Sequence, residues 1–411
     1  MYDDLVTVVS AIGHRRANWC LVKSTRSRSV ALLPVLAALV VVAAACASST
    51  PKAAPPSTTL PPPPVSITPS PANGATGVAL NAPLALSVRN GTIASVVVRS
   101  ATGPGPTGKV SSTGNAWMAA GNFVPNTAYA AEARITDTRG RTVTRRWHFV
   151  TGAPATALHT TLNVGDGGVY GVGMPIIVDL NSPISADRHA ALEKRLTVTA
   201  PAGVVGGWHW VTDSELHWRP QVFWPAHAKV SLKIDFAGFD AGKGVWGVDG
   251  RTVNFGIGDS HISIVDVNTH TMTVTQNGAA IRTVPVSTGR DQYPTKGGIH
   301  VVNEKSQSVT MDSATVGIPR DSPDGYYETV LWDVRISNSG EFVHAAPWST
   351  GAQGNSNVSH GCVNVSPADA EWFYNFSSAG DVVQVNNSPV QLDPWNGYGD
   401  WQLPWSQWTT T

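Results

Sequence analysis

The chain has 411 residues, enough for about two to four domains of ordinary size. It carries 28 lysine and arginine residues against 28 aspartate and glutamate residues, and this balance argues against a nucleic-acid partner, which normally requires a basic surface. Its 39 glycines, 29 prolines and 15 tryptophans are typical of a β-rich protein with many turns and not of a helical bundle. We therefore expect a mainly β fold class.

The N-terminus has the features of an export signal. A basic cluster precedes an apolar run over residues 30–45, which is short for a membrane span of about 20 residues. The small residues before Cys46 resemble a bacterial lipobox, although Ala43 lies where that pattern prefers leucine. We expect residues 1–46 to be a signal peptide with a lipobox, and the exported protein to be anchored to the membrane through lipidated Cys46, facing the cell wall. An uncleaved anchor and ordinary cleavage near Ala45 are the alternatives.

Composition and turn signals divide the rest of the chain into five segments. Residues 47–64 are rich in proline, serine and threonine and predict an extended tether. Residues 65–153 and 154–257 show short alternating strands separated by Gly, Pro and Asn turns, which predicts two immunoglobulin-like (Ig-like) β-sandwich modules. Residues 258–388 alternate again and predict a further β-rich domain. Residues 389–411 form a Trp-rich tail, which should pack on the protein rather than extend into water.

Local signals predict a few elements within these segments. Ser185 is a candidate N-cap for a helix over residues 186–196. The Asn277-Gly278 pair predicts a tight hairpin turn, and a short helix should begin after Ser366, because proline and an acid occupy its first turn. The polar stretch over residues 303–327 fits neither a helix nor a strand pattern, and loops of that length are usually lids or disordered segments.

Cys362 is the single cysteine expected in the exported, folded part of the chain, and it lies in Ser359-His360-Gly361-Cys362-Val363-Asn364. Exported proteins normally pair their cysteines, so an unpaired thiol indicates intermolecular pairing or a reactive sulfur. His360 and His344, two and eighteen residues away, are candidates to take its proton. A buried structural thiol and a zinc site built from these three side chains are the alternatives. The polar and small neighbours weaken the first, and the lack of a clear fourth ligand weakens the second.

The spacing of these residues carries a family resemblance. His344, fourteen intervening residues and then the Ser-His-Gly-Cys-Val-Asn run match every position of the signature of L,D-transpeptidases. Residues 258–411 resemble the YkuD-type catalytic domain of that family. The order of lipobox, tether, two Ig-like modules, catalytic domain and tail is similar to that of mycobacterial and related actinobacterial members.

The resemblance implies the residues of the site. Cys362 would be the nucleophile and His344 the general base, with the backbone carbonyl of Ala345 orienting the imidazole. His360 would support the catalytic loop, and the amides of Gly361 and Cys362 would form an oxyanion hole. Further substrate-binding residues implied by the resemblance are Tyr326, Ser339, Gly340, Asn364, Ser359, Met311 and Trp348.

The resemblance also implies the reaction. Cys362 would attack the third residue of a peptidoglycan tetrapeptide stem, release the terminal D-alanine, and pass the acyl group to a side-chain amine of a second stem as a 3→3 crosslink. Carbapenems are expected to acylate the same sulfur. No cofactor is expected, and no metal either, because Lys243 lies among the clustered aspartates between Asp235 and Asp249.

Two alternatives to transpeptidation remain. Water could intercept the acyl-enzyme, which would give an L,D-carboxypeptidase or an endopeptidase. The chain could also be a non-catalytic surface protein whose Ig-like modules engage the wall, although intact His344 and Cys362 argue against a decayed site. We expect the modules to be spacers, because their sequence shows no converging polar cluster.

Overall fold

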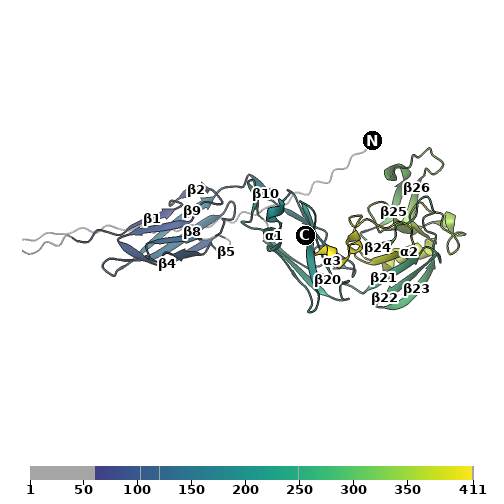
Figure 1. Cartoon of the computed structure of the whole chain (residues 1–411), viewed down its shortest axis with the longest axis horizontal. Coiled ribbons are helices and arrows are strands. Elements are labelled where there is room, and N and C mark those ends of the chain that lie inside the picture. Colours follow the sequence, from purple (N-terminus) through teal and green to yellow (C-terminus); the bar gives the residue numbers. More distant parts are fainter. Residues whose placement is uncertain (1–60, 102, 120, 249, 410–411) are drawn as a thin grey trace, which may run out of the picture. The chain divides into compact units, whose positions relative to one another are not determined.

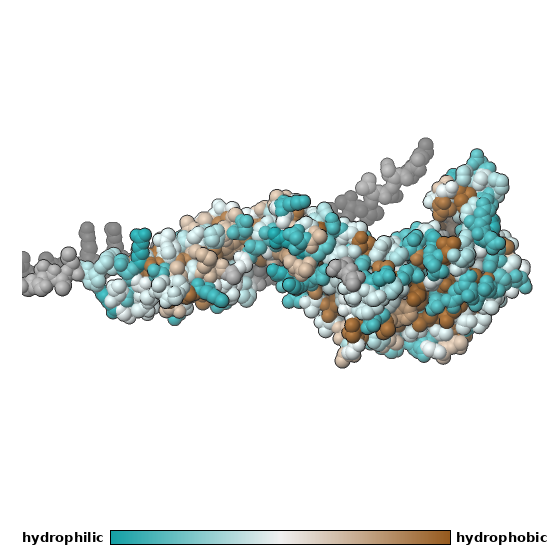
Figure 2. Space-filling view, in the orientation of Figure 1, coloured by the Kyte–Doolittle hydropathy of each residue, from teal (hydrophilic) through white to brown (hydrophobic). Residues whose placement is uncertain are grey.

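The computed structural model describes residues 61–411 apart from 102, 120, 249, 410 and 411. The predictions for the signal peptide, Cys46 and most of the tether lie outside the described residues. In the described part, strands outnumber helices, as the composition predicted (Figure 1). No helix in that part is long and apolar enough to span a membrane. On the face shown in Figure 2, apolar residues are scattered among hydrophilic ones.

The first β-sandwich is built from two sheets. The sheets contain, in spatial order, β1 (Ser66–Ser70), β3 (Ala85–Arg89), β7 (Ala116–Ala119) and β6 (Gly108–Val110), and β2 (Ala75–Val78), β9 (Thr142–Thr151), β8 (Ala128–Asp137), β4 (Gly91–Ser100) and β5 (Gly103–Pro104). Alternation along β8 places Tyr129, Ala131 and Ile135 in the core and their neighbours outside. Trp147 and Phe149 of β9 join the same core, so one face of this sheet is buried and the other is free.

The second β-sandwich has its own core. Its sheets contain β11 (Thr160–Leu162), β13 (Ile176–Leu180), β16 (Glu215–Pro220) and β15 (Gly206–Thr212); β12 (Val169–Tyr170), β20 (Gly250–Ile257), β17 (Lys229–Asp235) and β14 (Leu196–Thr199); and β10 (Thr156–Leu158), β19 (Val245–Gly247) and β18 (Asp240–Gly242). Helix α1 covers Ala186–Glu193 and is shorter than predicted. The prediction of helix to residue 196 was wrong because buried Leu196 pairs with Ile234 in a sheet.

The C-terminal domain packs two sheets and a helix around a valine-rich core. One sheet contains β23 (Ala279–Pro285), β22 (Thr271–Gln276), β21 (His261–Asp266), β29 (Val382–Asn386) and β24 (Gly298–Val301), and the other contains β25 (Glu304–Asp312), β26 (Tyr327–Arg335), β27 (Phe342–Ala345) and β28 (Val363–Val365). The hairpin turn is confirmed, since Asn277 and Gly278 have φ angles of 51° and 85°. Helix α2 (Pro367–Phe376) is also confirmed, with the Ser366 side chain accepting a hydrogen bond from the Asp369 amide.

The stretch left unassigned over residues 303–327 contains regular structure. Its first half is β25, which pairs with β26 along its whole length, and a short 3-10 helix, η1 (Ser313–Val316), follows. The sequence signal was weak because most side chains of β25 are exposed or half-buried, so polar residues occupy both faces. We call residues 312–327, which connect the two strands, the lid.

The C-terminal tail packs against the second sandwich through η3 (Gly399–Gln402) and α3 (Trp405–Trp408). Trp408 is fully buried, and the guanidinium of Arg219 lies 4.4 Å from its ring and 4.7 Å from the ring of Trp401. The Trp401 indole donates a hydrogen bond of 2.8 Å to the Gly173 carbonyl. The tryptophans therefore form part of a folded surface, and Arg219 is buried beneath them.

Candidate active site

Strands β27 and β28 place the two most important side chains on one face of their sheet. They run parallel, with Val343 beside Val363 and His344 beside Asn364. Both valines point into the core, so strand alternation turns His344 and Asn364 to the opposite face. Cys362 immediately precedes β28 and shares that parity. A separation of eighteen residues in the sequence becomes a separation of one strand in the sheet.

A pocket of about 240 Å³ lies over this face. Its lining contains Cys362, His344, His360, Tyr326, Met311, Trp348, Ser359 and Asn364, together with Glu328 and Val358, which the sequence analysis did not single out. Of the eleven site residues predicted in this domain, Ser339, Gly340 and Gly361 are absent from the lining. Within the described residues, no three His, Cys, Asp or Glu side chains are grouped so as to hold a metal ion.

His344 is held as a neutral base. Its side chain is buried, with 3% exposure, and Nδ1 lies 3.0 Å from the Ala345 carbonyl oxygen. A carbonyl can only accept, so we assign the proton to Nδ1, which leaves Nε2 with a free lone pair. Burial lowers the pKa of His344 to about 4, and the hydrogen bond to Ala345 opposes this shift only in part. At neutral pH the imidazole is therefore uncharged and able to accept a proton.

Cys362 is a free, partly exposed thiol. Its Sγ donates to the Gly340 carbonyl oxygen over 3.5 Å. Burial, together with the smaller effect of the charges of Glu341, Asp333 and Glu328, raises the pKa of the thiol to about 12. The resting sulfur therefore keeps its proton, and the thiolate has to form during attack on a substrate.

The backbone around the cysteine is fixed by Ser359. Its hydroxyl donates to the Cys362 carbonyl at 2.6 Å and accepts from the Gly361 amide at 3.1 Å. Thr295 donates to the Gly361 carbonyl at 2.7 Å. Gly361 has a φ of +123°, a conformation that residues with a side chain rarely adopt. Because the Gly361 amide already has an acceptor, the Cys362 amide is the better candidate to bind an oxyanion.

His360 belongs to a network that reaches the lid. Its Nε2 lies 2.9 Å from the Arg290 guanidinium, and its ring packs 5.0 Å from that of Tyr326. Arg290 forms an ion pair with the lid carboxylate of Asp324, which also accepts a hydrogen bond from Tyr293 at 3.2 Å. Burial and the charge of Arg290 lower the pKa of His360. The structure thus connects His360 to the lid and gives it no hydrogen bond to Cys362.

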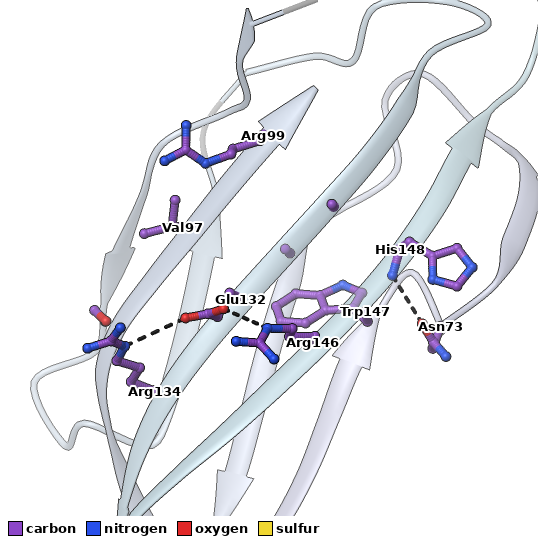
Figure 3. A pocket seen from close by; sticks show the side chains of 11 residues that line it. Asn73, Val97, Arg99, Glu132, Arg134, Arg146, Trp147 and His148 are labelled. Carbon is purple, nitrogen blue, oxygen red and sulfur yellow. Dashed lines mark hydrogen bonds and ion pairs between the residues drawn. The ribbon is translucent and has the colours of Figure 1, made fainter. Parts of the chain in front are cut away.

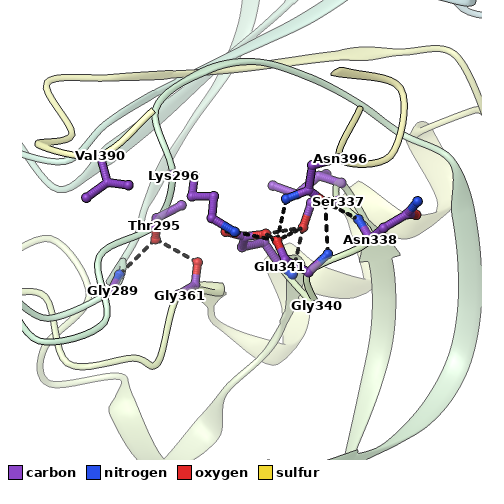
Figure 4. Close-up of polar contacts among 12 residues, drawn as sticks. Gly289, Thr295, Lys296, Ser337, Asn338, Gly340, Glu341, Gly361, Val390 and Asn396 are labelled. Atoms are coloured by element: carbon purple, nitrogen blue, oxygen red, sulfur yellow. Dashed lines mark hydrogen bonds and ion pairs between the residues drawn. The ribbon is translucent and has the colours of Figure 1, made fainter. Parts of the chain in front are cut away.

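Ser339, the residue before Gly340, belongs to a polar network with Lys296, Glu341 and Asn396, and Figure 4 shows these three partners. The Ser339 hydroxyl accepts from Lys296 and from Asn396, each over 2.7 Å, and donates to the Glu341 carboxylate at 2.5 Å. Lys296 also lies 3.7 Å from Glu341. This network fixes the turn that presents the Gly340 carbonyl to Cys362. The Ser339 hydroxyl is fully engaged within the protein.

Three acids near the sulfur were missed by sequence reasoning. Asp333 is completely buried, and burial raises its pKa to about 7, although the Val309 backbone and the charge of Arg335 oppose the rise in part. Glu328 lines the pocket, and burial raises its pKa as well. Glu341 is 6% exposed. The available signal for Glu328 and Asp333 was a charged residue in a strand with several apolar residues, which is weak because exposed strand positions are often charged, and Glu341 lies just before β27.

Comparisons with known proteins agree with this geometry. Residues 75–240 match the bacterial Ig domain, and residues 260–385 match the L,D-transpeptidase catalytic domain. L,D-transpeptidase 2 of Mycobacterium tuberculosis is 39% identical over 343 residues, which is 83% of this chain and 83% of that protein. L,D-transpeptidase 5 of the same species is 34% identical over 84% of this chain and 76% of its own length. A solved L,D-transpeptidase in complex with imipenem superposes with a TM-score of 0.50 at 35% identity, over 56% of this chain and 100% of the other. The chain therefore belongs to the L,D-transpeptidase family, whose members act on cell-wall peptidoglycan outside the cytoplasm.

Proposed function

We propose that Cys362 forms a thioester with the third residue of a peptidoglycan tetrapeptide stem. The observation that carries this proposal is the placement of a neutral imidazole, with Nδ1 bound to the Ala345 carbonyl, in the same pocket as the thiol. His344 Nε2 takes the proton as Sγ bonds to the substrate carbonyl carbon. It then gives the proton to the amide nitrogen as the bond to D-alanine breaks, so the histidine returns to its neutral form.

The second step transfers the acyl group. The side-chain amine of a neighbouring stem attacks the thioester carbon, His344 takes a proton from the amine, and Sγ leaves and regains a proton from the imidazole. The product is a 3→3 crosslink. The Cys362 amide stabilises the oxyanion in both steps. Hydrolysis of the same thioester by water would give carboxypeptidase or endopeptidase activity.

The remaining residues bind the substrate or support the loop. Tyr326, Met311 and Trp348 supply apolar walls, since all three line the pocket. Asn364 donates to Ser349 over 3.1 Å and also lines the pocket. Ser359 and Gly361 shape the cysteine loop, and His360 couples that loop to the lid. Ser339 and Gly340 would contact the substrate from the opposite side of the sulfur.

The same proposal includes the organisation of the chain. Residues 1–46 would be a signal peptide ending at a lipidated Cys46, and residues 47–64 a tether. Two Ig-like modules would follow over residues 65–153 and 154–257, with the catalytic domain over 258–388 and the tail over 389–411. The support is the lipobox-like sequence together with the two separate sandwich cores. This arrangement would hold the active site in the wall, away from the membrane.

Intact-protein mass spectrometry with a carbapenem tests the nucleophile and the base, because a relative was solved with imipenem. Residues 50–411 are incubated with imipenem as wild type, Cys362→Ala and His344→Ala, with the exposed histidine variant His227→Ala as control. We expect one adduct on the wild type and the control, none on Cys362→Ala, and acylation slowed by about 100-fold or more in His344→Ala. An adduct on Cys362→Ala would refute the assignment. Assays with a tetrapeptide stem then distinguish the crosslinked dimer, which transfer produces, from the tripeptide, which hydrolysis produces.

A further inference from the structure

The free face of the first sandwich carries a hollow of about 750 Å³ over strands β4, β8 and β9 (Figure 3). Strand register arranges its side chains in rows. Val97, Glu132 and Arg146 are opposite one another in one row, and Arg99, Ala130 and His148 are opposite one another in the next. Ala130 has almost no side chain, so its row is low in the middle and bordered by Arg99 and His148. The hollow follows from this pattern.

This face of the first sandwich carries more positive than negative charge. Glu132 forms ion pairs with Arg146 at 2.7 Å and Arg134 at 3.6 Å, and the hydrogen bond and charge of Arg146 lower the pKa of Glu132. One carboxylate therefore holds two guanidinium groups in place. Arg99 has no hydrogen-bond or ion-pair partner within the described part of the chain, and Figure 3 shows no contact at its guanidinium. The face carries three positive charges and one negative charge in a chain of zero net charge.

This cluster corrects the expectation that the Ig-like modules offer no converging polar group. Sequence reasoning missed it because its residues come from three strands and lie up to about fifty positions apart. Only the antiparallel register brings Arg99, Glu132 and Arg146 together. No single strand shows the cluster, since each strand contributes only one or two charges to this face, at alternating positions.

We propose that this face binds the carboxylates of peptidoglycan stem peptides, which holds the enzyme on its polymeric substrate. The choice of occupant rests on the proposed function, because peptidoglycan is the anionic polymer that the catalytic domain engages. Guanidinium groups bind carboxylates with two parallel hydrogen bonds. The free guanidinium of Arg99 provides one such fork, and Arg134 and Arg146 each keep donors that Glu132 does not use. A shallow, open surface suits an extended polymer, which contributes many weak contacts along its length.

Co-sedimentation with insoluble peptidoglycan tests this binding without any turnover. The exported chain carries Cys362→Ala throughout, and Arg99→Glu is compared with Arg145→Glu, an exposed arginine on the other face of β9. Both variants change the net charge equally. We expect the parent protein to sediment, Arg99→Glu to lose at least fivefold in bound fraction, and Arg145→Glu to bind like the parent. Binding should weaken at high salt and after the peptidoglycan carboxyl groups are amidated.

Three results would overturn the proposal: a parent protein that stays in solution, an Arg99→Glu variant that sediments like the parent, or equal losses in both variants. Thermal unfolding confirms that the variants are folded. The sedimentation result does not depend on the proposed catalytic function, which is tested separately by turnover of a soluble tetrapeptide stem in proteins that retain Cys362. In that assay the Arg99→Glu variant should turn over substrate like the wild type. Loss of imipenem acylation with intact sedimentation would count against the catalytic assignment alone.

Discussion

Replacing Asp400 with asparagine should weaken the attachment of the C-terminal tail, and the loss should depend on pH. Asp400 is fully buried and its Oδ1 lies 2.5 Å from Nδ1 of His217, which is 2% exposed. The other ring nitrogen of His217 lies 2.9 Å from Glu215. A histidine between two carboxylates is protonated, so the contact is a buried ion pair. Arg219 adds a second cation near Asp400, since the charge of Asp400 raises the pKa of that guanidinium against the effect of burial.

The size of the effect follows from the pKa of His217. Burial disfavours its charged form, but the charges and hydrogen bonds of Asp400 and Glu215 outweigh burial and raise the pKa from 6.5 to about 9. This rise corresponds to about 3 kcal/mol of stabilisation of the folded state. The contribution is complete below pH 6.5, where the unfolded chain is also protonated. It is lost as the pH rises towards 9, because the unfolded chain releases the proton first. In this window the free energy of unfolding should fall by about 1.4 kcal/mol per pH unit.

Urea denaturation followed by tryptophan fluorescence measures this slope, because Trp401 and Trp408 lie in the attached tail. Wild type, Asp400→Asn and Asp393→Asn, an exposed tail carboxylate, are compared between pH 6 and pH 9.5. Asp400→Asn should cost about 3 kcal/mol at pH 6, and the difference from wild type should shrink towards pH 9. Asp393→Asn should behave like the wild type. If Asp400→Asn and wild type show the same slope, His217 is not held charged by this contact and the reasoning fails.

Three further outcomes can be measured. As the pH rises from 4 to 7, the folded protein keeps the proton of Asp333 while the unfolded chain releases it near 3.8, so the contribution of Asp333 to the free energy of unfolding should fall by about 4 kcal/mol. Asp333→Asn should flatten this part of the stability curve measured by urea denaturation, and the same pH dependence in both proteins would contradict the assignment. Asp324→Asn removes the ion pair between Arg290 and the lid, so we expect a several-fold higher ratio of hydrolysis to transfer, measured by chromatography of the products. The free energy of unfolding should change by about 1 kcal/mol or less. An unchanged ratio would show that this lid contact does not control the access of water. Trp408→Ala removes a fully buried ring and should lower the free energy of unfolding by about 3–5 kcal/mol. The midpoint of urea denaturation measures this loss, and a midpoint equal to that of the wild type would contradict the prediction.

The sequence was informative where chemistry depends on neighbouring residues, and silent where it depends on register. The run around Cys362 and the spacing to His344 sufficed to predict a thiol–imidazole site, because the family motif contains both. The parallel pairing of β27 with β28, which turns the two side chains to one face, came only from the fold. Asp333 looked like an ordinary exposed strand charge, and its burial depends on how β26 lies beside its neighbours. The same limit applied to the Arg99 face, whose members belong to three different strands.

The acids around the sulfur determine when the thiol becomes reactive. A resting thiolate–imidazolium pair is unfavourable, because the pKa of Cys362 is raised to about 12 and that of His344 is lowered to about 4. Proton transfer therefore has to accompany formation of the bond to the substrate carbonyl, where the oxyanion moves negative charge away from the sulfur. The same carboxylates favour the second step, because the acceptor amine approaches as a cation and Glu328 lies in the pocket wall. The amine releases its extra proton to solvent before it attacks the thioester, and His344 takes the second proton as the new amide bond forms. An arrangement that keeps the nucleophile protonated in the absence of substrate also attracts the amine once the thioester has formed. This combination favours transfer to an amine over reaction with water.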